Sequence, residues 1–224
     1  MFPHLFKQQA SLILALLFTG GALFAQSGVP YEKLERARLI PNRANDGDSF
    51  HVSVNSKEFI FRLYQVDTPE TKQEFPERVK EQADYFGIKP EEAVRIGKIA
   101  QTFTHEKLAA KPFTVYTRWQ DAKGASRLPR YYAWIVVEDK TLEELLVANG
   151  LARIFGMPGN SPSGMNSAAF KTHLKVLEEK AKHDHLGAWS IQAGKSAAAQ
   201  TTTGSSSWDE MFPKHPSPAP GVTP

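Results

Sequence analysis

The stretch from Ser49 to Tyr64 reads SFHVSVNSKEFIFRLY, and it decides the class of fold. Apolar residues occupy every second position on both sides of a central polar pair: Phe50, Val52 and Val54 before it, and Phe59, Phe61 and Leu63 after it. Such alternation is typical of a strand with one buried face, and Asn55-Ser56 is a turn candidate between the two runs. The stretch therefore predicts a β-hairpin with one half-buried face.

The residues after the hairpin predict a second pair of strands and three helices. Runs rich in β-branched and aromatic residues cover Phe113 to Trp119 and Tyr131 to Val137, with a turn-rich basic connection between them. Helical patterns cover three segments: Pro90 to Leu108, Thr141 to Gly150 and Ser167 to His183. This order of elements predicts an α+β fold, a small antiparallel barrel or sheet with helices packed on it.

Both ends of the chain differ from globular sequence. Residues 1–26 carry one basic residue, Lys7, and then an uncharged apolar stretch, which is the pattern of a secretory signal peptide. The strongly apolar part is shorter than the about 20 residues of a membrane span, so we expect no stable membrane insertion after cleavage. An uncleaved anchor is the alternative. We expect a folded domain over 35–191, exported to the periplasm or the cell exterior, and a disordered tail rich in Ala, Thr, Ser and Pro over 192–224.

The composition of the 224 residues excludes several classes of protein. Because the chain has no cysteine, it is neither a disulfide-stapled scaffold nor a protein with a thiolate metal site. Hydrophobic residues make up 41%, too many for a wholly disordered chain, and the net charge of +3 is too small to identify a partner. We expect one globular domain with appendages, and a monomer.

Acidic residues stand at both open ends of the predicted hairpin. Asp46-Gly47-Asp48 precedes the first strand, and Asp67-Thr68-Pro69-Glu70 follows the second, which ends at Pro69 because proline lacks an N–H donor. A tight hairpin pairs residues symmetrically about its turn, so the two acidic segments fall on the same side of the sheet. Two carboxylates with a threonine hydroxyl or carbonyl form the hard oxygen site that calcium prefers. The alternative is that both segments are simply turns.

Two arginines favour a functional site over simple turns. Arg62 lies inside a run of aromatic and aliphatic residues, and Arg130 begins another strand, where a neutral residue is usual. A guanidinium donates in pairs to phosphoryl oxygens, and arginines beside a metal neutralise the charge that develops in phosphoryl transfer. Glu70 would then be free to accept a proton from an attacking water.

These motifs resemble the staphylococcal nuclease family. DGDSF at 46–50 and FRLYQVDTPET at 61–71 are similar to the family's DGDT and its R-L-x-x-V-D-T-P-E strand and turn. Later segments resemble the family in order: Arg130 to Trp134 its G-R-x-L-A-Y strand, Leu145 to Ala152 its L-V-x-x-G-L-A helix end, and Ala181 to Ser190 its closing helix and L-x-x-W. The resemblance covers about Arg43 to Ser190, and it implies a five-stranded OB-type antiparallel barrel with about three helices.

The resemblance also implies an activity, a calcium-dependent nuclease that hydrolyses phosphodiester bonds of DNA and RNA with little sequence preference. The calcium ligands would be the carboxylates of Asp48 and Asp67 and the backbone carbonyl of Thr68, and the catalytic residues Arg62, Glu70 and Arg130. In that scheme the glutamate positions or deprotonates water, while the arginines hold the phosphate and stabilise the transition state. The alternative is a non-catalytic OB-type module that binds nucleic acid or a protein.

The sequence departs from the family pattern at several places. Leu128-Pro129 stands where the family usually has Tyr-Gly, and residues 153–158 stand where the type enzyme carries tyrosines that flank the nucleotide, so base stacking can differ. Extra sequence at 72–89 predicts an added helix beside the site, either a lid or, as we favour, packing. Three residues are candidates for substrate contacts, with ordinary solvated surface as the alternative: His51, Lys72 and Arg127.

Overall fold

A computed structural model describes residues 30–124 and 128–193 of the protein. The predicted signal peptide at 1–26 and the tail from 194 onward lie outside the described residues. The first strand begins at Glu32, before the expected domain start at 35, and a last helical turn covers 188–193, beyond the expected end at 191. Within the described ranges, no helix is long and apolar enough to cross a membrane.

The predicted hairpin is confirmed and forms the centre of the fold. Strand β2 (Ser49–Val54) pairs antiparallel with β3 (Lys57–Leu63), from Val54 opposite Lys57 to Ser49 opposite Arg62. Asn55 and Ser56 connect the strands with φ values of 49° and 63°, as in a two-residue type I′ turn. With this register, the residues just before β2 and just after β3 lie together at the open end of the hairpin, opposite the turn.

Five strands close into a barrel. Strand β1 (Glu32–Leu39) pairs antiparallel with β2 and with β5 (Phe113–Asp121), and β5 pairs antiparallel with β6 (Arg130–Val137). Strand β6 then closes on β3 in a parallel pairing that places Ile60 opposite Arg130. The α+β, OB-type barrel is confirmed, but the prediction that it is wholly antiparallel is wrong at this closure. An odd number of strands cannot alternate in direction around a closed ring, so one pairing must be parallel.

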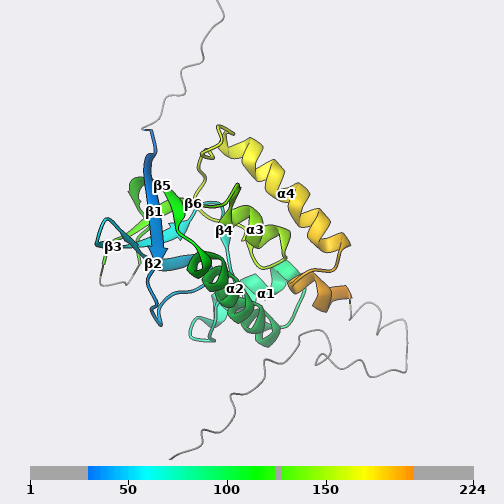
Figure 1. Ribbon diagram of the computed structural model, residues 1–224. Helices are drawn as coiled ribbons and strands as arrows, with labels where there is room; N and C mark the ends of the chain where they lie inside the picture. Colours follow the sequence, from blue (N-terminus) through cyan, green and yellow to red (C-terminus); the bar gives the residue numbers. More distant parts are fainter. Residues whose placement is uncertain (1–29, 125–127, 194–224) are drawn as a thin grey trace, which may run out of the picture.

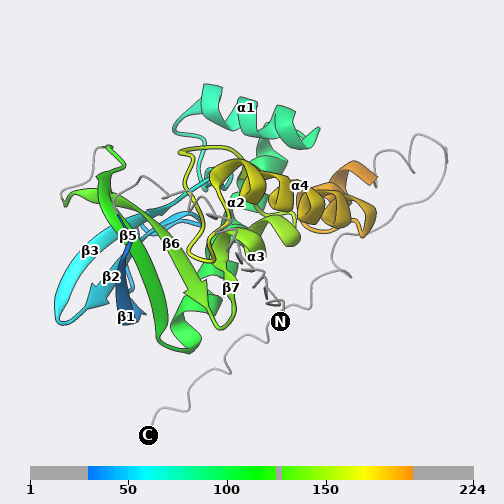
Figure 2. The ribbon, with the colours of Figure 1, turned by 90° about the horizontal axis from the view of Figure 1, so that it is seen from above.

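Helices gather on one side of the barrel, as Figures 1 and 2 show from two directions. The helices are α1 (Pro76–Phe86), α2 (Pro90–Ala110), α3 (Leu142–Ala148) and α4 (Ser167–His183), and the short strands are β4 (Val66–Asp67), β7 (Lys140–Thr141) and β8 (Arg153–Ile154). The three predicted helices are confirmed as α2, α3 and α4, and α1 is the helix predicted within 72–89. The predicted capping box is present, because Glu144 N donates to Thr141 Oγ1 at 3.2 Å and Thr141 N donates to Glu144 Oε2 at 2.8 Å.

Aromatic contacts join the helices to the barrel. The buried ring of Trp134 in β6 stacks on Tyr64 with centroids 5.3 Å apart, and it meets Phe170 of α4 edge-on at 4.8 Å. Helix α1 buries Phe86 against Trp189 at 5.0 Å, so the added helix does pack on the domain. These contacts fix α1 beside the open end of the hairpin.

One carboxyl group, that of Glu143, is buried in the core. Glu143, in the first turn of α3, is fully buried, and within the described part of the chain neither of its oxygens makes a hydrogen bond of normal geometry. Burial raises the pKa of Glu143 well above its usual range, although backbone groups of Ile135 and Tyr64 oppose the shift. The folded protein therefore holds this proton more tightly than the unfolded chain, whose glutamate pKa is about 4.3. The free energy of unfolding consequently falls as the pH rises above that value.

We expect Glu143→Gln to raise the free energy of unfolding at pH 7, because burial makes the proton of Glu143 costly to lose in the folded protein and an amide does not titrate. The gain should shrink toward pH 4, where the glutamate is protonated in both states. Urea unfolding at pH 4 and pH 7 measures both values, with Glu138→Gln as an exposed control. Equal gains at the two pH values would contradict the assignment.

Candidate active site

The open end of the hairpin carries a buried pair of carboxylates. Asp48 directly precedes β2 and Asp67 ends β4, and their exposed fractions are 2% and 0%. Thr68 N donates to Asp48 Oδ2 at 3.2 Å, and Leu63 N donates to the carbonyl of Asp48 at 2.9 Å. The structure therefore brings together the three residues predicted as metal ligands.

Arg62 of β3 bridges the two carboxylates. Its Nη2 lies 3.2 Å from Asp48 Oδ2 and 2.9 Å from Asp67 Oδ1, and 16% of its side chain is exposed. The carboxylates, Asp48 above all, raise the pKa of Arg62 against the effect of burial. Burial in turn raises the pKa of Asp48, and Arg62 opposes that shift. Oxygens of both acids thus converge on one nitrogen atom.

Asp67 has three more partners, which the sequence analysis missed. Arg153 Nε donates to Asp67 Oδ2 at 2.8 Å, because the pairing of β4 with β8 places the two residues opposite each other. Gln82 of α1 donates from Nε2 to Asp67 Oδ2 at 2.9 Å, and Arg78 of α1 pairs through Nη2 with Asp67 Oδ1. Helix α1 therefore contributes side chains to the site as well as packing.

A hollow of about 630 Å³ opens beside the acid pair. Three arginines and several carboxyl groups line it, among them Arg62, Arg78, Arg130, Asp46 and Glu70. Arg78 Nε lies 2.6 Å from Glu70 Oε1, at an angle that does not make a hydrogen bond. Burial raises the pKa of Glu70 while Arg78 opposes the shift, and burial together with the charge of Asp48 raises the pKa of Asp46. A hollow with guanidinium donors and a carboxyl group matches a phosphate and a water molecule.

Arg130 holds its place at the rim through the backbone. It begins β6, and its Nε donates to the carbonyl of Lys123 at 2.9 Å across the preceding turn. Burial and the charge of Arg62 lower the pKa of Arg130. The two predicted arginines thus line one hollow from the parallel strands β3 and β6.

The three candidate substrate contacts have different outcomes. His51 is buried, and its backbone N and ring Nδ1 lie 2.9 Å and 2.7 Å from Asn45 Oδ1, so the loop before the hairpin covers it and keeps it from the hollow. Lys72 is exposed and pairs at 3.2 Å with Glu74, which lines the hollow, so it lies near the rim. Arg127 lies outside the described residues.

Residues 154–158, within the segment that departs from the expected pattern, line a separate hollow of about 470 Å³. Phe155 there is 56% exposed, and the guanidinium of Arg153 lies 4.3 Å from its ring centroid. Tyr132 lines the same hollow. An exposed aromatic ring, that of Phe155, is therefore present in this segment.

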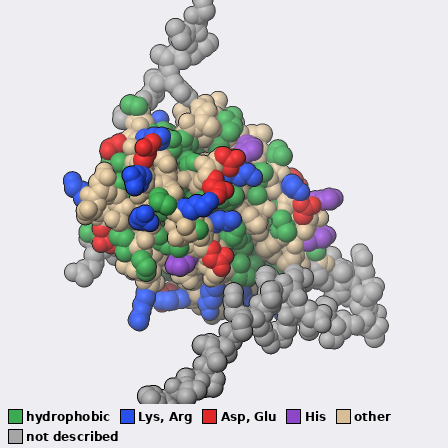
Figure 3. All heavy atoms as spheres, in the orientation of Figure 1, with side chains coloured by type: hydrophobic (Ala, Val, Ile, Leu, Met, Phe, Trp, Pro, Cys, Tyr) green, Lys and Arg blue, Asp and Glu red, His purple; other side chains and the backbone are tan. Residues whose placement is uncertain are grey.

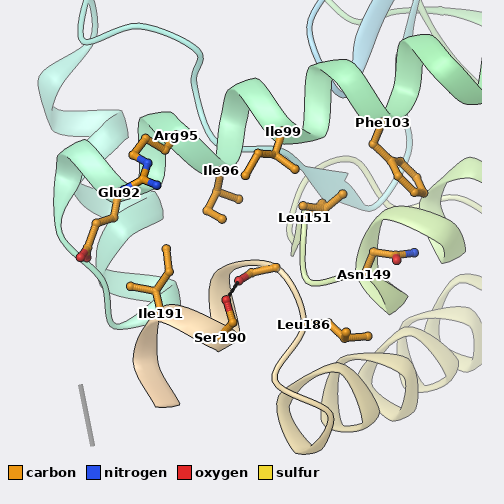
Figure 4. A pocket seen from close by; sticks show the side chains of 11 residues that line it. Glu92, Arg95, Ile96, Ile99, Phe103, Asn149, Leu151, Leu186, Ser190 and Ile191 are labelled. Atoms are coloured by element: carbon orange, nitrogen blue, oxygen red, sulfur yellow. Dashed lines mark hydrogen bonds between the residues drawn. The ribbon is translucent and has the colours of Figure 1, made fainter. Parts of the chain in front are cut away.

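Another hollow, of about 250 Å³, lies between α2 and the last helical turn (Figure 4). Its lining is mainly apolar, with Ile96, Ile99 and Leu151 among the residues that point into it, and with Arg95 and Asn149 as polar members. It shares no lining residue with the hollow of the acid pair. Its lining holds one carboxylate, Glu92, and one arginine, Arg95, and neither is buried, so it is not the candidate active site.

The oxygens near Arg62 suit a hard cation. Gln82 Nε2 lies 2.9 Å from Asp67 Oδ2 and 3.0 Å from the carbonyl of Thr68, so this carbonyl converges with the acid pair. Within the described residues, no group of three acidic or histidine side chains could hold a metal ion by itself. The chemistry of the donor set nonetheless fits calcium, which accepts backbone carbonyls and water beside carboxylates.

Surface charge adds little to the identification of this site. Figure 3 shows acidic and basic side chains interspersed on the face that it draws, in line with the net charge of +3. On this face, the arginines of a local hollow are better placed to recognise an anion than the mixed surface charge is.

An OB-type barrel that gathers carboxylates and arginines in one hollow holds the kinds of group that phosphodiester cleavage uses. The sequence model of the staphylococcal nuclease homologue family matches residues 60–191, and this chain belongs to that family. The chain is also 28% identical over 170 residues to endonuclease YncB of Bacillus subtilis (strain 168), covering 74% of this chain and 68% of that protein. The region that the family model matches includes Arg62, Asp67, Glu70 and Arg130, whereas Asp48 precedes that region.

Proposed function

We propose that the protein is an exported, calcium-dependent endonuclease that hydrolyses phosphodiester bonds in DNA and RNA with little sequence preference. The observation that carries the proposal is the buried acid pair bridged by Arg62, next to a hollow that Glu70 and Arg130 also line. The name of the Bacillus relative supports cleavage within a strand. The apolar residues 1–26 support export.

The residues of the hollow have separate roles in phosphodiester hydrolysis. Arg62 and Arg130 bind the phosphate from two neighbouring strands and neutralise the charge that develops on its oxygens. Glu70 accepts a proton from the water that attacks phosphorus, the bond from phosphorus to the ester oxygen on the opposite side breaks, and that oxygen takes up a proton from solvent. Calcium, held by Asp48, Asp67 and the carbonyl of Thr68, would supply a further positive charge beside the phosphate. Since these groups contact the phosphate rather than the bases, we infer little sequence preference.

The direct test uses the full chain, purified after expression with its own leader. We expect cleavage of circular single-stranded DNA, which has no ends, and of RNA in the presence of calcium, and no cleavage once a chelator is added. Intact substrates at every calcium concentration would reject the proposal and favour a module that only binds. N-terminal sequencing of the purified protein tests export, since removal of the leader places the first residue near Ser27.

A further inference from the structure

Helix α1 presents two polar side chains to the acid pair. Its buried face consists of Val79, Gln82, Ala83 and Phe86, and Arg78 lies one helical turn before Gln82. Phe86 anchors this face against Trp189, so the helix is held at the site by packing that does not depend on its polar contacts. The position of α1 beside Asp67 is therefore built into the domain.

These two side chains bind the oxygens that we assign to calcium. Arg78 pairs with Asp67 Oδ1 and also reaches Glu70 Oε1 at 2.6 Å. Gln82 Nε2 donates to Asp67 Oδ2 at 2.9 Å and to the carbonyl of Thr68 at 3.0 Å, and Gln82 Oε1 accepts from Glu70 N at 2.9 Å. A guanidinium thus neutralises the same carboxylate that would hold the cation.

Three arginines contact Asp67, and Arg78 is the one whose side chain can most easily move away from it. The exposed fraction of its side chain is 37%, against 16% for Arg62 and 7% for Arg153. Arg78 also lines the hollow, which offers its guanidinium a solvated place away from Asp67. Arg62 contacts both buried acids and Arg153 is itself buried, so moving either would leave a buried charge unpaired.

We propose that Arg78 is a tethered competitor of calcium. Its guanidinium neutralises Asp67 and Glu70 in the structure, and calcium binding would displace it from Asp67 into the hollow. Helix α1 therefore sets the calcium affinity of the site. The inference rests on the proposed function, because it takes Asp48, Asp67 and Thr68 as the calcium ligands.

The test is a calorimetric titration of the full chain with calcium chloride, without nucleic acid. Arg78→Met removes the guanidinium but keeps the alkyl chain, and we expect it to tighten calcium binding about fivefold to tenfold. Lys80→Met is the matched control, because Lys80 lies on the same helix, pairs with Asp84 at the surface and carries the same charge. We expect the control to change the affinity less than twofold. Arg78→Lys keeps the charge but loses the paired donors of the guanidinium group, so the calcium affinity of this variant should fall between those of wild type and Arg78→Met.

A second measurement keeps the test valid if Arg78→Met is poorly folded without metal. Saturating calcium should raise its melting temperature more than that of wild type, because calcium replaces the missing guanidinium. Calcium affinity and melting shift equal to those of Lys80→Met would overturn the inference while leaving calcium-dependent cleavage intact. A wild-type chain that neither binds calcium nor needs it for cleavage would overturn both the inference and the calcium dependence.

Discussion

Glu70→Gln is expected to lower the rate of phosphodiester cleavage by about 10²–10⁴-fold, the usual contribution of a general base. The amide keeps the shape of the side chain but cannot accept the proton of the attacking water. The fold should survive, because a quarter of the Glu70 side chain, 25%, is exposed and its backbone contact with Gln82 does not involve the carboxyl group.

The matched control for this variant is Glu74→Gln. Glu74 lines the same hollow, but its side chain is 63% exposed and pairs with Lys72. Initial rates on DNA at saturating calcium, together with thermal melts of both variants, separate loss of catalysis from loss of fold. Equal rates for the two variants would remove Glu70 from the mechanism.

The hairpin at 49–64 could be predicted because apolar residues occupy every second position from Phe50 to Val54 and again from Phe59 to Leu63. Strand β1 could not, because its buried residues Leu34 and Ala37 are three positions apart, a spacing that resembles a helix. The cause is a bulge at which Arg36 has a φ of 60° and the register with β5 shifts between Leu34 and Ala37. A bulge depends on the neighbouring strand, so the sequence of β1 alone does not reveal it.

The acid pair could be predicted for a similar local reason. Asp48 directly precedes the hairpin and Asp67 follows its end at Leu63 by four residues, so the turn at Asn55-Ser56 brings the two segments to the same end of the hairpin. The position of Arg62 on the same hairpin follows from the same register.

The other partners of Asp67 depend on tertiary structure. Arg153 reaches Asp67 through the pairing of two strands of two residues each, which are too short to show a periodic pattern. Arg78 and Gln82 lie on a helix that could be predicted from the sequence, but the direction from which that helix approaches the barrel could not. The burial of His51 could not be predicted for the same reason, since the covering loop at Asn45 is placed by tertiary contacts.

Arg130→Ala is expected to lower kcat/KM by about 10³-fold, as the loss of an arginine that stabilises a phosphoryl transition state does. In the described part of the chain no carboxylate lies within ion-pair distance of Arg130, and its guanidinium is held by the carbonyl of Lys123. Removal of the Arg130 side chain therefore leaves no buried charge unpaired. Removal of Arg62, in contrast, would take an ion-pair partner from both Asp48 and Asp67. Activity should fall with little change in stability.

The control for charge is Arg95→Ala, an exposed arginine on α2 that lines the apolar hollow of Figure 4. Arg130→Lys should recover only part of the rate, because an ammonium group cannot donate in pairs to two phosphoryl oxygens. Full recovery by lysine would mean that Arg130 acts only as a positive charge. A rate for Arg130→Ala equal to that for Arg95→Ala would show that phosphate binding depends on Arg62 without help from β6.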